Sequence, residues 1–154
     1  MDPTVVEQLV KTTEEVFETM IFRTAERLPQ AADVAPAAGP HVVATVAFAG
    51  QCTGLVSFHS TEETARDIAA SMLGIPSSEI RGEMTDALGE VANMIAGGLR
   101  LKLKSKGIDV AIAIPTVITG SDFRTRYVTP VDRVVCPFRL DHDARVFVEL
   151  ILNQ

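Results

Sequence analysis

The sequence predicts an α/β fold of the α+β type, with two long helices and a short helix packed on a mainly antiparallel sheet of about five to six strands. Two observations predict this class. Residues 78–107 repeat apolar side chains every three or four positions, and the segments 41–60 and 108–152 are rich in β-formers. At 154 residues the chain has the length of one domain, so we expect residues 1–154 to form a single domain.

The N-terminal part begins with an amphipathic segment. Residues 3–28 are predicted as the first long helix, because apolar side chains recur at helical spacing and Pro3 suits a helix start. Residues 29–40 contain repeated Pro, Ala and Gly, which predicts an irregular connector.

A hairpin and a short helix are predicted next. The runs 41–50 and 52–60 are β-rich and are separated near Gly50. Thr61 is followed by two glutamates, which is typical of a helix N-cap, and the short helix should reach Leu73.

The second half repeats this succession of helix and strands. Ser77 or Ser78 is predicted to cap the central helix, and a turn follows Gly107. The later strands are expected at 108–119 with an interruption at Pro115, and then at 126–128, 132–140 and 144–152.

The central helix has two distinct faces. The apolar face consists of Ile80, Met84, Leu88, Val91, Ile95 and Leu99, and the opposite face consists of Asp86, Glu90, Asn93 and Gly97. A polar face of this kind is usually only solvated. Here, however, the helix contains Asn and three Gly residues, which are poor helix formers. They favour a face that another molecule approaches closely, and both interpretations stay open from these residues alone.

Composition excludes several functions. The net charge of −6 argues against nucleic acid binding, which needs clustered Lys and Arg. No apolar run approaches the roughly 20 residues that span a bilayer. We therefore expect a cytoplasmic protein without membrane insertion, in which Cys52 and Cys136 are reduced.

The chain contains a sparse internal similarity between residues 3–76 and 77–152. A shift of 75 residues places Glu15 on Glu90 and Pro40 on Pro115. The same shift places Lys11, Glu18 and Phe22 on Asp86, Asn93 and Gly97. If the similarity reflects a duplication rather than chance, two halves should be related by a pseudo-two-fold axis, and only the second keeps the polar face.

The residues on this face resemble a known motif. An Asp or Ser, then Glu four positions later, Asn three positions later and Pro a little over twenty positions further is the pattern of the CheC/CheX/FliY chemotaxis phosphatases. Here it reads Asp86, Glu90, Asn93 and Pro115. The resemblance covers nearly the whole chain, and a single intact motif is similar to the CheX branch.

This resemblance implies a CheC-like pseudo-two-fold fold and a phosphatase for the aspartyl-phosphate of a CheY-type response regulator. Glu90 would pair with a lysine of the regulator and Asn93 would orient the attacking water, while Asp86, Gly97 and Pro115 would support the contact. No cofactor or metal is expected on this chain, because Mg²⁺ would be held by the receiver domain of the regulator. CheX-like proteins are dimers, and the apolar strand at 144–152 would be hazardous at an open sheet edge. We therefore expect a homodimer.

Two other functions compete with this one. A non-catalytic module could dock on a receiver domain or a flagellar-switch protein through the same helix. A stand-alone hydrolase of small molecules is disfavoured, because no nucleophile and base are recognisable together.

Overall fold

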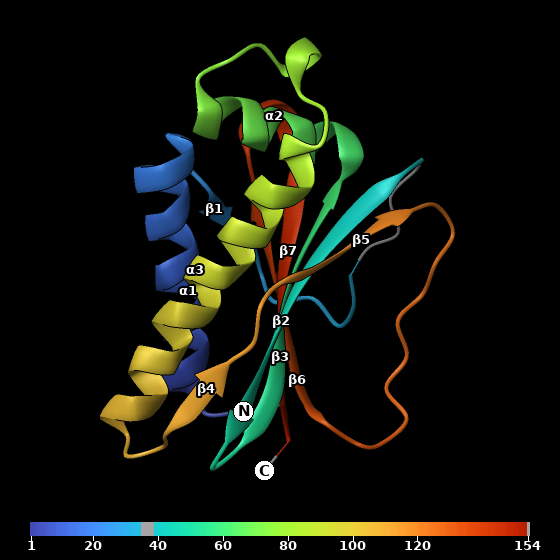
Figure 1. Cartoon of the computed structure of the whole chain (residues 1–154). Coiled ribbons are helices and arrows are strands. Elements are labelled where there is room, and N and C mark those ends of the chain that lie inside the picture. Colours follow the sequence, from blue (N-terminus) through green and yellow to red (C-terminus); the bar gives the residue numbers. More distant parts are fainter. Residues whose placement is uncertain (35–38, 154) are drawn as a thin grey trace.

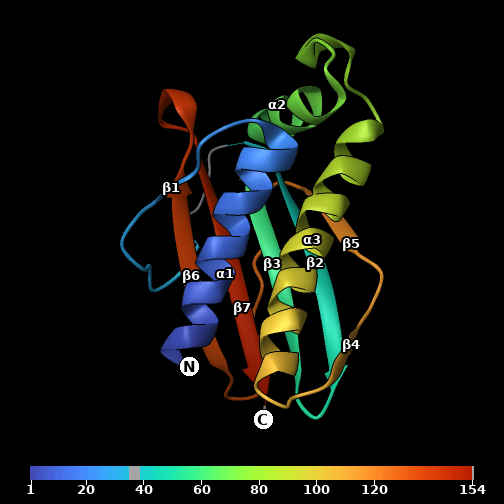
Figure 2. The same cartoon turned by 90° about the vertical axis from the view of Figure 1, so that its left-hand side faces the viewer.

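The first helix packs beside the third on one face of the sheet. In this computed structural model, which describes residues 1–34 and 39–153, α1 spans Pro3–Val16 and continues as a π-helical turn over Phe17–Ile21. Asp2 caps α1 by accepting a hydrogen bond of 2.8 Å from the backbone N–H of Thr4. α3 spans Glu83–Ser105 and runs antiparallel to α1 (Figures 1 and 2).

The predicted extent of the first helix is wrong at its C-terminal end. Phe22 adopts a left-handed conformation with φ 59°, and residues Glu26–Arg27 form the short strand β1 instead of helix. β1 pairs with β6, and the Glu26 carboxylate accepts a hydrogen bond of 3.0 Å from the Arg139 guanidinium. Tertiary pairing therefore overrides the helical pattern beyond residue 21.

The predicted start of the central helix is also wrong. Ser77–Glu79 form a 3₁₀ turn, Ile80 is extended, and α3 follows Gly82 without a side-chain cap. Ile80 is nevertheless buried in the core, at 1% exposure. Its predicted place in the core is confirmed, but its backbone belongs to the connection before α3.

The hairpin and the short helix are confirmed. β2 spans His41–Gly50, β3 spans Thr53–Thr61, and they pair antiparallel. α2 spans Glu62–Leu73 and lies across one end of the sheet (Figure 1). The Thr61 hydroxyl accepts a hydrogen bond from the Thr64 N–H, and left-handed Gly74 ends the helix. Of the predicted connector over 29–40, residues 35–38 lie outside the described residues.

Among residues 1–34 and 39–153 the sheet has seven strands, slightly more than predicted, and all of these strands pair antiparallel. The order is β1-β6-β7-β3-β2-β4, and β5 also pairs with β2. The remaining strands are β4 (Val110–Ile112), β5 (Thr116–Gly120), β6 (Asp132–Arg139) and β7 (Arg145–Asn153). The predicted strand over 126–128 is wrong, since this segment is irregular.

The last strand lies inside the sheet, because β7 pairs with β3 on one side and with β6 on the other. The hazard considered for 144–152 at an open edge therefore does not arise. Its apolar residues are buried by the neighbouring strands and by the helices, so they give no reason of their own for dimer formation. The homodimer itself stays a prediction.

The strand order is symmetric when the two halves of the chain are exchanged. β3 then corresponds to β7, and β2 corresponds to β6. β1 corresponds to β4 and β5, which both pair with β2. This arrangement supports the predicted pseudo-two-fold relation. A shift of 75 residues fails within the sheet, however, because it aligns β2 with β5, and these two strands are direct neighbours. The duplication therefore stays a prediction.

Candidate functional site

The two faces of α3 are confirmed. Met84, Leu88, Val91, Ile95 and Leu99 are buried, and none is more than 8% exposed. Asp86 and Glu90 are exposed, while Asn93 and Gly97 are half-buried. At about 100° per residue, these four positions fall within a sector of about 60° around the helix axis. The structure thus brings all four residues together on the outward side of α3.

The polar side chains on this face are free to contact another molecule. Among residues 1–34 and 39–153, no hydrogen bond or ion pair engages the side chains of Asp86, Glu90 or Asn93. The Asn93 carboxamide can both donate and accept a hydrogen bond. One exposed carboxylate lies one helical turn before it and another lies two turns before it. This arrangement can hold a water molecule beside a cationic group of a partner.

The fifth predicted residue lies beside this face. A Cβ placed on Gly89 would be 3.4 Å from the Cβ of Pro115, so the proline ring covers the helix backbone at that position. Gly89 is one turn before Asn93. The segment between β4 and β5 therefore forms a wall along one flank of the polar face.

The three helical glycines have different surroundings. Gly98 faces α1, where an added Cβ would lie 2.4 Å from the Thr12 side chain. Gly89 faces Pro115 on the opposite flank. Only Gly97 has open space around it, with nothing within 4 Å. Close approach from outside the chain is thus possible at Gly97, whereas the other two serve internal packing.

A buried ionic cluster lies on the opposite face of the sheet. Glu149 of β7 is 2% exposed, and its carboxylate accepts hydrogen bonds from His59 Nε2, at 3.0 Å, and from Arg133. Arg133 also donates to Asp33, at 2.6 Å. Burial by itself raises the pKa of Glu149, but these hydrogen bonds outweigh it and hold the pKa below its usual range.

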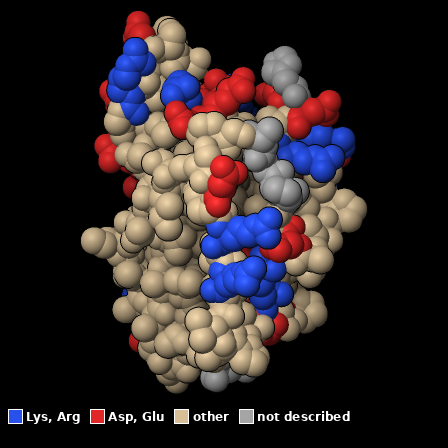
Figure 3. Space-filling view, turned by 90° about the vertical axis from the view of Figure 1, so that its right-hand side faces the viewer, with Lys and Arg blue, Asp and Glu red and all other residues tan. Residues whose placement is uncertain are grey.

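This cluster links neighbouring strands on the outer side of the sheet. Basic and acidic side chains gather near the middle of that side (Figure 3). Sequence reasoning missed it, although Glu149 within the apolar run of the last strand was a signal. Because all its charges are paired with one another, its contribution is structural.

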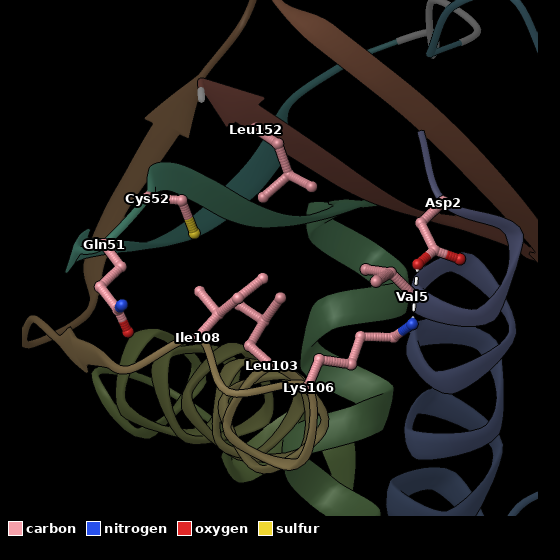
Figure 4. Close-up of a pocket in the computed structure, with 8 residues that line it drawn as sticks. All are labelled: Asp2, Val5, Gln51, Cys52, Leu103, Lys106, Ile108 and Leu152. Carbon is pink, nitrogen blue, oxygen red and sulfur yellow. Dashed lines mark hydrogen bonds and ion pairs between the residues drawn. The ribbon is translucent and has the colours of Figure 1, made fainter.

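A separate cavity lies at the far end of α3, near both termini (Figure 4). It measures about 390 Å³ and is lined mainly by apolar side chains, among them Val5, Leu103 and Leu152. An ion pair of 2.8 Å between Lys106 and Asp2 borders it. None of the five predicted site residues lines this cavity.

Neither a metal centre nor a membrane span is recognisable in the part of the chain that the structure describes. No group of three or more His, Cys, Asp or Glu residues is placed to hold a metal ion there. No helix there has the length and apolar character to cross a bilayer.

Residues 42–139 match the family model of the chemotaxis phosphatase CheX. The match covers more than half of the chain and includes all of α3 and Pro115. The chain belongs to the CheX family. A curated relative, the CheY-P phosphatase CheX of Thermotoga maritima, is 33% identical over 89 residues, which are 56% of this chain and 57% of that protein. The match to this relative therefore spans little more than half of its length.

Solved structures share the fold over nearly the whole length. The chemotaxis protein CheX of Desulfovibrio desulfuricans is 27% identical, with a TM-score of 0.82 over 97% of this chain and 99% of its own. CheX in the CheX-CheY-BeF3-Mg complex of Borrelia burgdorferi is 21% identical, with the same TM-score over 97% of this chain and 98% of its own. At that identity the second likeness shows the fold alone.

Proposed function

We propose that this protein hydrolyses the aspartyl-phosphate of a CheY-type response regulator. The observation that carries this proposal is the placement of Glu90 and Asn93, unpaired and one turn apart, on the outward side of α3 in a CheX-family chain. The Thermotoga relative bears the name CheY-P phosphatase, and the Borrelia CheX was solved in complex with CheY. Both support the same substrate class here.

The reaction requires few catalytic groups on the phosphatase itself. An acyl phosphate is already reactive, and Mg²⁺ held by the receiver domain can stabilise charge on the transferring phosphoryl group. The missing component is a water held in line with the phosphorus. The Asn93 carboxamide would hold this water in place. Its carbonyl oxygen accepts a hydrogen bond from the water, while its amide group binds the phosphoryl oxygens or the partner.

The other residues position the partner. The Glu90 carboxylate would pair with a lysine of the receiver domain, and Asp86 would extend the negative charge by one turn. Gly97 would let a loop of the partner approach the helix backbone, and Pro115 would form the flank. We keep the expectations of a homodimer and of a cytoplasmic location as parts of this proposal.

The test follows the lifetime of a phosphorylated receiver. A CheY-type receiver is phosphorylated with a small phosphodonor, and phosphate release is measured with and without this protein. We expect acceleration by the wild type and a loss of about 100-fold or more in kcat for Asn93→Ala, because water positioning acts in the transition state. Glu90→Ala should raise KM.

Glu15→Ala and Glu18→Ala serve as controls. Both residues are exposed near the end of the first helix, at the positions that the internal similarity aligns with Glu90 and Asn93. They should leave the rate unchanged. Binding of the phosphorylated receiver without faster phosphate release would favour the non-catalytic docking module instead.

A further inference from the structure

The outward face of α3 continues beyond the motif. Eleven residues make about three helical turns, or roughly 16 Å along the axis. Leu101 therefore follows Glu90 on the same line of the helix surface, Lys104 follows Asn93, and Arg100 follows Gly89. The C-terminal half of α3 repeats the geometry of the motif with aliphatic and basic side chains in place of acidic ones.

These additional side chains are exposed to solvent. Leu101 is 70% exposed, and Arg100 and Lys104 are also exposed. Ile114, which precedes the Pro115 that packs on α3, is 86% exposed. Two large aliphatic side chains are thus exposed here: Leu101 lies in line with Glu90, and Ile114 directly precedes Pro115, which packs on Gly89.

The basic residues have no partner of their own within the described chain. Seven ion pairs connect residues elsewhere in it, and none includes Arg100, Lys104, Asp86 or Glu90. Lys106 differs, because it pairs with Asp2 at 2.8 Å. Basic residues near a helix C-terminus also complement the helix dipole. The dipole gives no reason, however, for the exposure of Leu101, which directly follows Arg100 on α3.

Charge on the face is therefore separated along the helix. Acidic side chains occupy its N-terminal part and basic ones its C-terminal part, with Asn93 and Gly97 between them. The span from Asp86 to Lys104 is about 27 Å, which matches the diameter of a small domain. A partner that covers it would meet both charges at once.

We propose that Arg100, Leu101, Lys104 and Ile114 select the receiver domain that this protein dephosphorylates. The fitting receiver carries acidic side chains opposite the C-terminal half of α3, separate apolar contacts for Leu101 and for Ile114, and its lysine opposite Glu90. This inference rests on the proposed function, because it assigns a second part of the same docking surface. Charge complementarity of this kind governs encounter and specificity, and exposed aliphatic residues that a partner covers add the free energy of apolar burial.

The first experiment measures kcat and KM with the phosphorylated receiver. The double variant Arg100→Glu/Lys104→Glu should raise KM by about tenfold at low salt while kcat at saturation stays unchanged. The matched control is Arg124→Glu/Arg126→Glu, which makes the same change in net charge in the exposed loop after β5. Increasing the salt concentration should raise the KM of the wild type more than that of the double variant, because screening removes the attraction that the variant already lacks.

The second experiment tests the aliphatic contacts. Ile114→Gln should raise KM by about tenfold, whereas the control Val128→Gln should not, although Val128 is fully exposed. Leu101→Gln should likewise raise KM, whereas its control Leu73→Gln should not, although Leu73 is 51% exposed at the end of α2.

The outcomes separate the two proposals. If the wild type does not accelerate phosphate release from any receiver tested, the proposed function fails. A second outcome is an active wild type and an inactive Asn93→Ala, with Arg100/Lys104, Leu101 and Ile114 variants that behave like their controls. That result overturns only the proposal that these residues select the receiver. A fall in kcat rather than a rise in KM for these variants would also overturn it, because docking residues act on binding.

Discussion

Pro115 lies directly against Gly89 of α3, with its Cβ 3.4 Å from the point that a Cβ at residue 89 would occupy. The contact joins the segment between β4 and β5 to the helix one turn before Asn93. Because both strands pair with β2, the wall beside the polar face is fixed to the sheet. The position of Pro115 is thus coupled to the size of residue 89.

This coupling predicts opposite effects for two substitutions. Gly89→Ala adds one methyl group at van der Waals distance and should stabilise the protein by up to about 1 kcal/mol through helix propensity, with activity retained. Gly89→Val must displace Pro115 and should lower the free energy of unfolding by about 1–3 kcal/mol and reduce phosphatase activity. Urea unfolding and receiver dephosphorylation measure both. Equal stability of the two variants would show that Pro115 does not constrain the site.

The neighbouring glycines 97 and 98 should respond differently to the same change. Gly98→Ala places a Cβ within 2.4 Å of Thr12 and should separate α1 from α3, with a cost of about 1–3 kcal/mol. Gly97→Ala meets open space and should be neutral or stabilising by up to about 1 kcal/mol. Thermal melts compare the two directly. Under the proposed function, Gly97→Leu should leave the fold intact but raise KM.

The buried cluster around Glu149 should matter for stability and not for catalysis. Glu149→Gln keeps the shape of the side chain but removes the charge that Arg133 and His59 contact, so we expect a loss of about 2 kcal/mol in urea unfolding. Glu26→Gln, at the exposed pair with Arg139, is the control and should change stability little. A Glu149→Gln protein that loses activity without losing stability would contradict this assignment.

The same cluster gives the fold a pH dependence at acidic pH. The folded pKa of Glu149 is below the ordinary value of about 4.3. The stabilisation is therefore complete above that value and is lost as the pH falls through the lower folded pKa. Hydrogen bonds from Lys106 and Thr4 hold the pKa of Asp2 at about 2, so Asp2 loses its contribution in the same direction. The difference between wild type and Glu149→Gln should shrink below pH 4, which melts across pH 2–6 would measure.

The oligomeric state can be tested independently of activity. We expect a homodimer at micromolar concentration by light scattering. Within the described chain, the outer edges of the sheet are those of β1 on one side and of β4 and β5 on the other, whereas β7 is interior. A monomer at these concentrations would contradict the expectation without affecting the proposed activity.

Much of this protein could be predicted from its sequence because the decisive patterns are local. The two faces of α3 follow from side-chain spacing, and the Thr61 cap and the Gly74 stop follow from backbone chemistry. Pro115 separates β4 from β5, as expected. Asp86, Glu90, Asn93 and Gly97 could be placed together for the same reason. Positions on one straight helix are fixed relative to one another by its periodicity.

Tertiary structure alone decided what depends on contacts between distant segments. The pairing of Glu26–Arg27 with β6 ended the first helix early, and β7 became an interior strand because β3 and β6 both pair with it. The contact of Pro115 with Gly89 and the burial of Glu149 between His59 and Arg133 also join residues far apart in the chain. Spacing within one element cannot encode such contacts, because they arise only when separate elements pack against each other.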